Sequence, residues 1–424
     1  MKREGAVGVA PEASGGNRVN DRSAAKGELP DLLYSDAERA LSDALASLLA
    51  DRGGLDKTLA RTESGQTYDD KLWSGVASDL GCAGLLIPER DGGAGASYRE
   101  AAAAAEVLGS YVAPVPFLGS AVVATAALLS VAGGAPTSAG TPFTPARAAA
   151  GLLAKMADGG VTTALAVPFA TAPRPEVSTA FPGSVRVAGP RPGDAATGVA
   201  RLRGMVTGVA DALPASVLLV PADGVPQCLY LVDMTAEGVA KAPVTSLDMT
   251  RQLCDLSFDD APATLIASGP AASRAIHAAL AAGAGVLAAE QTGLAQRCLD
   301  MTVAYVKERR QFARPVGSFQ ALKHRLADLW VSVTQARAAS RYAAACLAAG
   351  SPDVDVAVAL AKAYCSEVAV TAAQECVQLH GGIGFTWEHP AHLYLKRAKA
   401  DSIAFGTADA HRAALASLVD LPAS

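Results

Sequence analysis

Residues 309–328 read RRQFARPVGSFQALKHRLAD, and this stretch is the most informative in the chain. It follows a long helical pattern, and Pro315 and Gly317 predict a turn before the next helix. Guanidinium groups present forked donors that match phosphate oxygens, while Gln311 and Phe312 can contact a ring and its polar edge. The same cations would also suit a helix C-terminus, where positive charge complements the helix dipole. Residue chemistry alone leaves both interpretations open.

A second distinctive stretch, residues 378–389, reads QLHGGIGFTWEH. Three glycines within four residues let a ligand or another backbone approach closely, and the polar residues after them can cap a helix. A glycine-rich turn is also typical of ordinary loop connections, so this pattern alone does not define a binding site.

The pattern around these stretches predicts a mainly α fold with a central β domain. Helical period occupies residues 41–49, 72–80, 98–108 and 120–131, and short Val- and Leu-rich segments at 161–168, 216–220, 228–232 and 252–258 predict strands. Four long helices are then predicted over residues 271–307, 318–349, 354–379 and 389–418. We therefore expect a disordered segment 1–27, an N-terminal helical domain 28–160, a β domain 161–268 and a C-terminal helical bundle 269–424.

Composition restricts the class of protein further. With 424 residues, 50% hydrophobic and 18% charged, the chain can bury a large core. The formal net charge is -5 and the basic residues are scattered, which argues against a nucleic-acid partner. The seven cysteines have no metal-ligand spacing, so no metal site is predicted. The N-terminus has no apolar signal core, and the longest apolar run, Ala278–Ala289, is too short to span a bilayer, so we expect a cytoplasmic protein without membrane association.

Both quoted stretches resemble signatures of the acyl-CoA dehydrogenase family, of the form R-x-Q-F-G-x-P-x-x-x-F-Q-x-x-x-H-x-x-A-D and Q-x-x-G-G-x-G-F. The similarity extends from about Leu33 to Leu418 and includes Ile87–Glu89, Glu106–Gly109 and Asp248–Arg251. The resemblance implies an N-terminal helical domain, a middle β-barrel-like domain and a C-terminal four-helix bundle, assembled as a dimer of dimers.

The resemblance also implies where FAD would be contacted. In the family, the signature Arg, Gln and Phe reach FAD across a subunit interface, and the glycine-rich stretch faces the adenosine side of a neighbouring flavin. The residues that match these positions, together with a possible contact in the last loop, are Arg309, Gln311, Phe312, Gln378, Gly381, Gly382 and Thr407.

The chain departs from the family at the catalytic base. In many members the base is the Glu of an E-G-T segment, which aligns with Phe405 here; in others it is a Glu that aligns with Gly283. Glu290 lies about two helical turns after Gly283, within an apolar run, where a carboxylate would have a raised pKa or need a partner. Glu290 is therefore a candidate base, and the alternative is a buried structural hydrogen-bonding role.

A second departure concerns the flavin ring. The family often has a T-E-P-x-x-G-S-D loop that holds the ring, whereas residues 166–171 read AVPFAT. The chain's own flavin-ring site is therefore expected to be incomplete.

The resemblance implies α,β-desaturation of an acyl-CoA thioester, with hydride transfer to FAD, in lipid metabolism. The two departures favour a heterotetramer of the α2β2 type, in which this chain completes a site on a homologous partner. An electron-transfer flavoprotein is the expected electron acceptor. The alternatives are a self-sufficient homotetramer and a non-catalytic structural subunit that has kept the fold.

Overall fold

The computed structural model describes residues 30–64, 68–133, 144–173, 185–188, 199–223 and 227–421. The segment predicted to be disordered, residues 1–27, lies outside these ranges. Leu32–Ser424 form one unit by their contacts, so the domain boundaries expected near residues 160 and 268 stay predictions.

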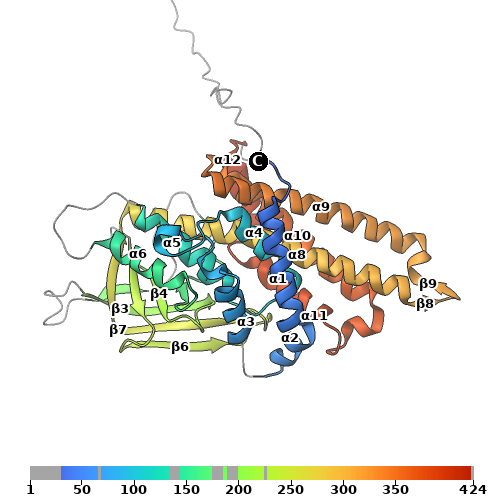
Figure 1. The fold of residues 1–424 in the computed structure, drawn as a ribbon, viewed down its shortest axis with the longest axis horizontal. Coiled ribbons are helices and arrows are strands. Elements are labelled where there is room, and N and C mark those ends of the chain that lie inside the picture. Colours follow the sequence, from blue (N-terminus) through green and yellow to red (C-terminus); the bar gives the residue numbers. More distant parts are fainter. Residues whose placement is uncertain are drawn as a thin grey trace, which may run out of the picture. The chain divides into compact units, whose positions relative to one another are not determined.

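Helices form the first part of this unit (Figure 1). The first, α1 (Asp36–Arg52), begins with a capping box, in which Ser35 Oγ accepts a hydrogen bond from the Glu38 N–H and the Glu38 carboxylate accepts one from the Ser35 N–H. The helices that follow are α2 (Leu55–Thr62), α3 (Asp70–Ser74), α4 (Tyr98–Ser110), α5 (Thr125–Ala132) and α6 (Pro145–Met156), with a π-helical segment over Phe117–Ala124. The sequence pattern did not predict α2 and α6, because α2 is short and α6 is rich in alanine.

A seven-stranded sheet follows, with strand order β1-β4-β5-β7-β3-β2 and with β6 paired to β7. Its strands are β1 (Thr163–Leu165), β2 (Arg186–Ala188), β3 (Val199–Ala210), β4 (Val217–Ala222), β5 (Cys228–Asp233), β6 (Val239–Val244) and β7 (Leu253–Ser268). Among the paired strands that the structure describes, β1 and β4 run parallel and the other pairs are antiparallel. The predictions missed β2, β3 and β6. Two glycines with positive φ and two register shifts interrupt the alternation along β3, and most of β6 is exposed.

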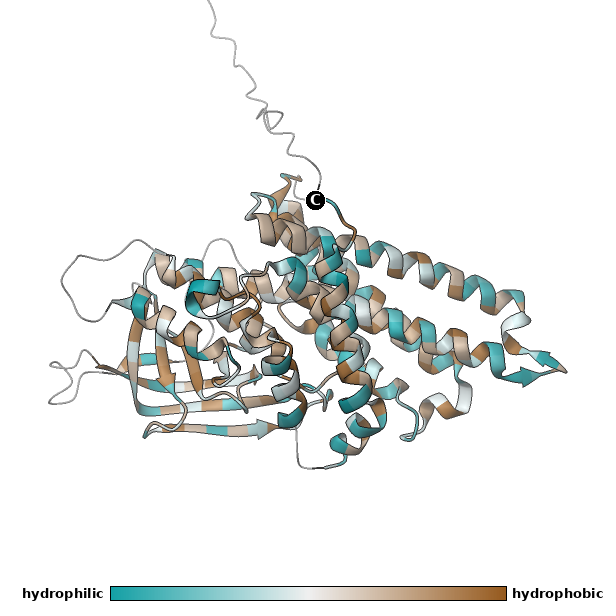
Figure 2. Cartoon of the chain, in the orientation of Figure 1, coloured by the Kyte–Doolittle hydropathy of each residue, from teal (hydrophilic) through white to brown (hydrophobic). Residues whose placement is uncertain are grey.

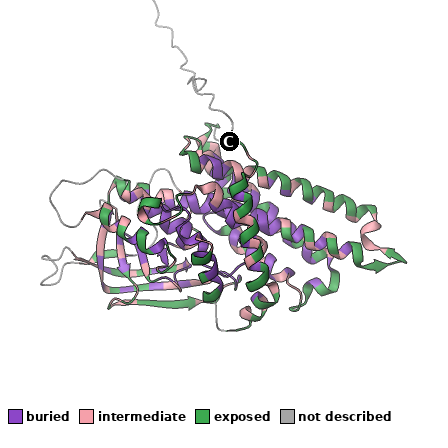
Figure 3. Ribbon diagram, in the orientation of Figure 1, coloured by how far each residue is buried: buried purple, intermediate pink, exposed green. Residues whose placement is uncertain are grey.

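The C-terminal part contains α8 (Pro270–Glu308), α9 (Gln320–Ala349), α10 (Val354–Leu379), α11 (Ala391–Ile403) and α12 (Ala408–Leu418). Figure 3 shows that much of α8 is buried, whereas α9 is largely exposed. By length and composition α8 and α10 could span a membrane, but 72% and 67% of their most apolar windows are buried inside the structure, as in the core helices of many proteins. The three long helices α8, α9 and α10 confirm the predicted helical C-terminal part.

The prediction of a single helix over residues 389–418 is wrong. The structure divides it into α11 and α12, separated by a short loop in which Phe405 and Gly406 have φ values of 50° and 99°. The extended Ala404 ends α11, the two left-handed residues turn the chain, and Thr407 begins α12 by accepting a hydrogen bond from the Ala410 N–H. The residues that the family resemblance singles out, Phe405 and Thr407, therefore lie in this loop.

Between α8 and α9 the chain forms a hairpin of β8 (Arg310–Gln311) and β9 (Arg314–Pro315). Its two turn residues, Phe312 and Ala313, have φ values of 53° and 60°, which are uncommon for residues other than glycine. The hairpin projects from the ends of α8 and α9 and is strongly hydrophilic on both strands (Figures 1 and 2). The Arg signature is therefore carried at an exposed tip.

Candidate active site and partner-facing motifs

The two positions at which the family resemblance expects a catalytic base lie against each other. A Cβ atom added to Gly283, in α8, would lie 2.7 Å from Cζ of Phe405 and 2.8 Å from Cγ2 of Val123. The Phe405 ring thus covers the face of α8 that Gly283 leaves open, and no larger residue fits at position 283 without displacing it. Neither position carries a group that can accept a proton.

Phe405 is held in its left-handed conformation from several sides. Its N–H donates to the carbonyl of Phe169 (2.7 Å), and His411 Nε2 donates to its carbonyl (2.8 Å). Burial lowers the pKa of His411 to about 4, which keeps this imidazole neutral at physiological pH. The rings of Phe405 and Phe169 meet edge to face, 5.3 Å between centroids. The contacts therefore impose a backbone conformation that a phenylalanine rarely adopts alone.

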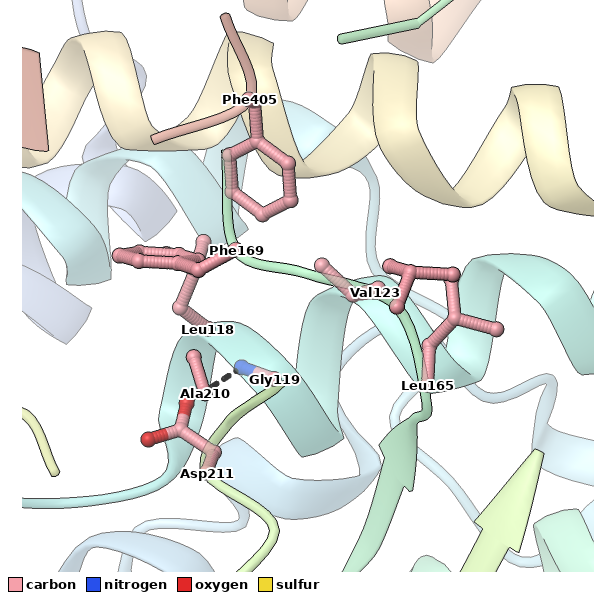
Figure 4. A pocket seen from close by; sticks show the side chains of 9 residues that line it. Leu118, Gly119, Val123, Leu165, Phe169, Ala210, Asp211 and Phe405 are labelled. Carbon is pink, nitrogen blue, oxygen red and sulfur yellow. Dashed lines mark hydrogen bonds between the residues drawn. The ribbon is translucent and has the colours of Figure 1, made fainter. Parts of the chain in front are cut away.

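A cavity of about 20 Å³ remains beside these two rings (Figure 4). Its lining residues are mostly apolar: Leu118, Gly119, Val123, Leu165, Val167, Phe169, Ala210, Asp211 and Phe405. This volume suits one or two water molecules and is far too small for a three-ring flavin. Phe169 belongs to the segment 166–171 that replaces the family's flavin-ring loop. The residues at this position therefore do not fit the FAD ring.

One carboxylate that the sequence did not reveal, Asp211, lines this cavity. It follows β3 with a φ of 58°, and Figure 4 shows its hydrogen bond to the backbone N–H of Gly119 (2.8 Å). Its other oxygen accepts a hydrogen bond from the Tyr68 hydroxyl (2.8 Å). Burial raises the pKa of Asp211. Both oxygens have internal donors, so Asp211 joins the β domain to the N-terminal helices and is not poised as a free base.

Glu290 lies in α8, is almost fully buried, and has two arginine partners. Its carboxylate accepts hydrogen bonds from Arg251 Nη2 (2.6 and 2.8 Å) and from Arg397 Nε (2.8 Å). Burial alone would raise its pKa, but the two guanidinium groups outweigh burial and hold the pKa of Glu290 below its usual value. Glu290 is not among the residues that line the cavity. This geometry favours the structural role over the role of a base.

Two further buried carboxylates extend the contacts of Glu290 with Arg251 and Arg397 into a network. Arg251 also binds Asp401 (2.7 Å), and Arg397 binds Asp248 (3.1 Å). Burial, together with the neighbouring carboxylates Glu290 and Asp248, raises the pKa of Asp401 to about 7 although Arg251 opposes the shift. Within the described part of the chain, Oδ2 of Asp401 has no hydrogen-bond partner. These contacts connect the loop before β7 with α8 and α11.

A buried lysine ties the network to the loop that carries Phe405. Lys362, in α10, donates to Ser366 Oγ (2.8 Å) and to the carbonyls of Asp401 (3.0 Å) and Gly406 (3.3 Å). Burial lowers the pKa of Lys362 to about 8. Arg251 in turn lies 5.4 Å from the Phe169 ring centroid. The network therefore supports both aromatic rings that close the site.

The predicted FAD contacts occupy a different, exposed part of the chain. Arg309 is exposed at the end of α8, as is Gln311 in the hairpin, and the side chain of Phe312 is 86% exposed. The remaining predicted contacts are also exposed: Gln378 at the end of α10, Gly381 and Gly382 in the following 3-10 turn, and Thr407. A Cβ at Gly381 or Gly382 would have no atom within 4 Å, so this turn is open to an approaching molecule. The structure thus brings Gly283 and Phe405 together and leaves the FAD signature residues facing outward.

Comparisons with known proteins identify the family of this chain. The chain matches the acyl-CoA dehydrogenase N-terminal domain over residues 35–135 and the acyl-CoA dehydrogenase C-terminal domain over residues 273–419. It is 34% identical to the acyl-CoA dehydrogenase IpdE2 of Mycobacterium tuberculosis over 84% of this chain and 89% of that protein. It is 32% identical to the acyl-CoA dehydrogenase FadE34 of the same organism, over 77% of this chain but 39% of that longer protein. Among solved structures, the ChsE4-ChsE5 complex of M. tuberculosis contains a chain with a TM-score of 0.78 and 26% identity, covering 93% of this chain and all of that one. The chain therefore belongs to the acyl-CoA dehydrogenase family and is an acyl-CoA dehydrogenase subunit.

Proposed function

We propose that this chain works as one half of a heteromeric acyl-CoA dehydrogenase of the α2β2 type, in which it completes the FAD site of a homologous partner and has no working site of its own. The observation that carries the proposal is the contact between Phe405 and Gly283. Both usual base positions are apolar, and the phenyl ring fills the space in front of Gly283, so neither position offers a carboxylate to remove a proton.

The two nearby carboxylates do not supply the missing base. Asp211 accepts two hydrogen bonds from within the chain, and Glu290 is bound by two arginines. A general base needs a free lone pair within hydrogen-bond reach of the proton that it removes. Proton removal at the substrate α-carbon is therefore assigned to the partner subunit.

Exposed residues on this chain are suited to a partner. The guanidinium of Arg309 faces outward and can bind a phosphate, and the amide of Gln311 is held in the hairpin by a hydrogen bond to the Arg310 carbonyl (3.0 Å). The turn after α10 also exposes large apolar side chains, since Phe385 is 75% and Trp387 67% exposed. Exposed apolar side chains of this size are common on surfaces that another protein covers.

The relatives support a two-chain assembly. The solved neighbour is a complex of two different proteins, ChsE4 and ChsE5. The matched part of FadE34 leaves 61% of that protein (100 minus 39) outside the match, which is enough for a second unit of similar size. The same two units, joined in one chain in FadE34 and carried by two separate chains in the ChsE4-ChsE5 complex, would explain both observations.

FAD, when bound at the shared site, supplies the acceptor for the substrate hydride. We assign Arg309 to its pyrophosphate, and Gln311 and Phe312 to the same cofactor across the interface. Gln378, Gly381 and Gly382 are assigned to the adenosine side of the cofactor. Thr407 Oγ1 already accepts the Ala410 N–H (3.3 Å), so a contact between Thr407 and FAD would compete with the cap of α12. An electron-transfer flavoprotein as acceptor and a cytoplasmic location stay predictions.

The test is to purify the chain alone and together with each homologous acyl-CoA dehydrogenase chain, and to record flavin absorbance, native mass and desaturase activity. We expect flavin and activity only in the two-chain assembly. In that assembly Arg309→Gln should weaken FAD binding by about 10- to 100-fold, because a charge-assisted hydrogen bond contributes about 1.5–3 kcal/mol. Arg325→Gln is the matched control, since Arg325 is bound to Glu375 of the same chain (2.7 Å). A lone chain that forms a homotetramer with bound flavin and full activity would refute the proposal.

A further inference from the structure

A groove on the outside of the helical region, bounded by α1, α4 and α8, is unrelated to the site described above. Its volume is about 360 Å³, within the range of small-molecule pockets. None of the residues that line it also lines the cavity beside Phe405. None of the residues assigned to FAD lines this groove.

Close packing of α4 against α8 makes the inner wall of the groove. A Cβ at Gly293 would lie 1.8 Å from the Glu106 carbonyl oxygen, so these two helices touch through their backbones. Ala103 is fully buried at this contact, and Ala46 and Val107 line the same groove. The small side chains leave an apolar hollow beneath α1 whose inner wall is rigid.

One side of the groove is fixed by an aromatic residue. The Tyr34 hydroxyl donates to Glu106 (2.5 Å), and the guanidinium of Arg341 lies 3.7 Å from the Tyr34 ring centroid. Burial raises the pKa of Tyr34, which therefore remains a neutral phenol. The charge of Glu106 is balanced by Arg337 (3.0 Å). This side of the groove therefore consists of the fixed Tyr34 ring and the Glu106 carboxylate, whose charge is balanced by Arg337.

The mouth of the groove holds a cation without a carboxylate partner. Arg297 is exposed and interacts with the Tyr394 hydroxyl by a hydrogen bond, and it forms no ion pair with any residue that the structure describes. Asp300 shares the mouth, and its carboxylate accepts a hydrogen bond from Gln296 Nε2 (2.8 Å). The single guanidinium of Arg297 beside an apolar hollow suits a ligand with one negative charge, because the nearby Asp300 carboxylate would repel a second negative charge.

We propose that this groove binds a small amphipathic carboxylate, with its apolar body against Ala46 and Val107, above the wall that Ala103 backs, and its carboxylate paired with Arg297. Guanidinium and carboxylate match in shape and charge, and the apolar lining favours burial of a hydrocarbon or ring body. The site would be separate from the acyl-CoA site of the assembled enzyme.

The test uses 2-naphthoate as the probe, measured by calorimetric titration against both the lone chain and the two-chain enzyme. We expect one saturable site in each, and binding of the uncharged analogue 2-naphthalenemethanol that is at least about tenfold weaker. Arg297→Gln should weaken 2-naphthoate binding by the same factor. Arg274→Gln, at another exposed arginine of α8, is the matched control and should leave binding unchanged.

A second variant tests the hollow itself. Ala103→Leu fills the inner wall and should abolish binding of both the acid and the alcohol, with circular dichroism to verify the fold. Absence of saturable binding, or equal loss in Arg297→Gln and Arg274→Gln, would overturn the proposal. Binding to the lone chain that disappears in the two-chain enzyme would also overturn it, since the groove would then be a subunit contact.

Discussion

The substitution Glu290→Gln separates the two roles considered for this residue. It keeps the shape of the side chain but removes the negative charge that faces Arg251 and Arg397, both less than 5% exposed. The amide oxygen can still accept one hydrogen bond. Arg251 keeps its contact with Asp401 at 2.7 Å and Arg397 its contact with Asp248 at 3.1 Å, so neither guanidinium is left wholly unpaired.

The expected loss of stability follows from this geometry. Removing one partner of a buried ion pair destabilises a protein by about 3–5 kcal/mol, and the contacts that remain favour the lower end, about 3 kcal/mol. The exposed pair of Arg325 and Glu375 provides a contrast, because Glu375→Gln should change the free energy of unfolding by less than about 1 kcal/mol.

Two measurements check this prediction: urea unfolding followed by circular dichroism, and turnover of the two-chain enzyme with saturating FAD. We expect Glu290→Gln to unfold at clearly lower urea than Glu375→Gln while the folded assembly keeps its turnover. Unchanged stability together with a large loss of turnover would refute the structural role and identify Glu290 as the base.

Three further predictions concern the loop around Phe405. Gly283→Ala should destabilise the chain by about 1–3 kcal/mol, because its Cβ would lie 2.7 Å from the Phe405 ring, and Phe405→Leu should restore part of the loss in a double-mutant cycle of unfolding free energies. Burial raises the folded-state pKa of Asp401 to about 7, above its usual value of 3.8, so the folded state binds this proton first and the contribution of Asp401 to stability falls as pH rises between about 4 and 7. Burial lowers the folded-state pKa of His411 to about 4, below its usual value of 6.5, so His411 acts in the opposite direction over nearly the same interval. Asp401→Asn should therefore make stability rise more steeply with pH, as measured by urea midpoints from pH 4.5 to 7. Thr407→Val removes the cap of α12 and should lower stability by about 1 kcal/mol without changing FAD retention; loss of flavin would instead show that Thr407 contacts the cofactor.

The hydrophobic periodicity of the sequence was sufficient to predict the long helices. The structure places α10 at Val354–Leu379, the bounds that the pattern predicted, because its apolar residues repeat without interruption. The hydrophobic pattern did not predict the loop between α11 and α12, because that loop depends on backbone conformation. The loop between α11 and α12 depends on positive φ at Phe405 and Gly406, and a phenylalanine gives no signal of that conformation.

The site could be predicted only where a family signature marked it. The resemblance selected Gly283 and Phe405 as the positions of the usual bases, and the structure places these two residues in contact. It could not reveal Asp211, whose partner Tyr68 is 143 residues away in sequence, or the pairing of Arg251 with Asp401 across 150 residues. Such contacts depend on packing between distant elements, and sequence pattern carries no information about them.

The loop that carries Phe405 explains how a subunit can lose a catalytic side chain without losing the fold around it. Three groups hold the loop through its backbone or through the network: Lys362 binds the carbonyls of Asp401 and Gly406, His411 binds the carbonyl of Phe405, and Phe169 accepts its N–H. None of these contacts requires a particular side chain at position 405, so a carboxylate there can be exchanged for a phenyl ring while the backbone stays in place. The same network fixes α10 and α11, between which the exposed glycine-rich turn lies. The backbone of this loop and the exposed turn after α10 are therefore held by the buried network and not by the side chain at position 405, so the substitution that the proposed function requires leaves the surrounding fold in place.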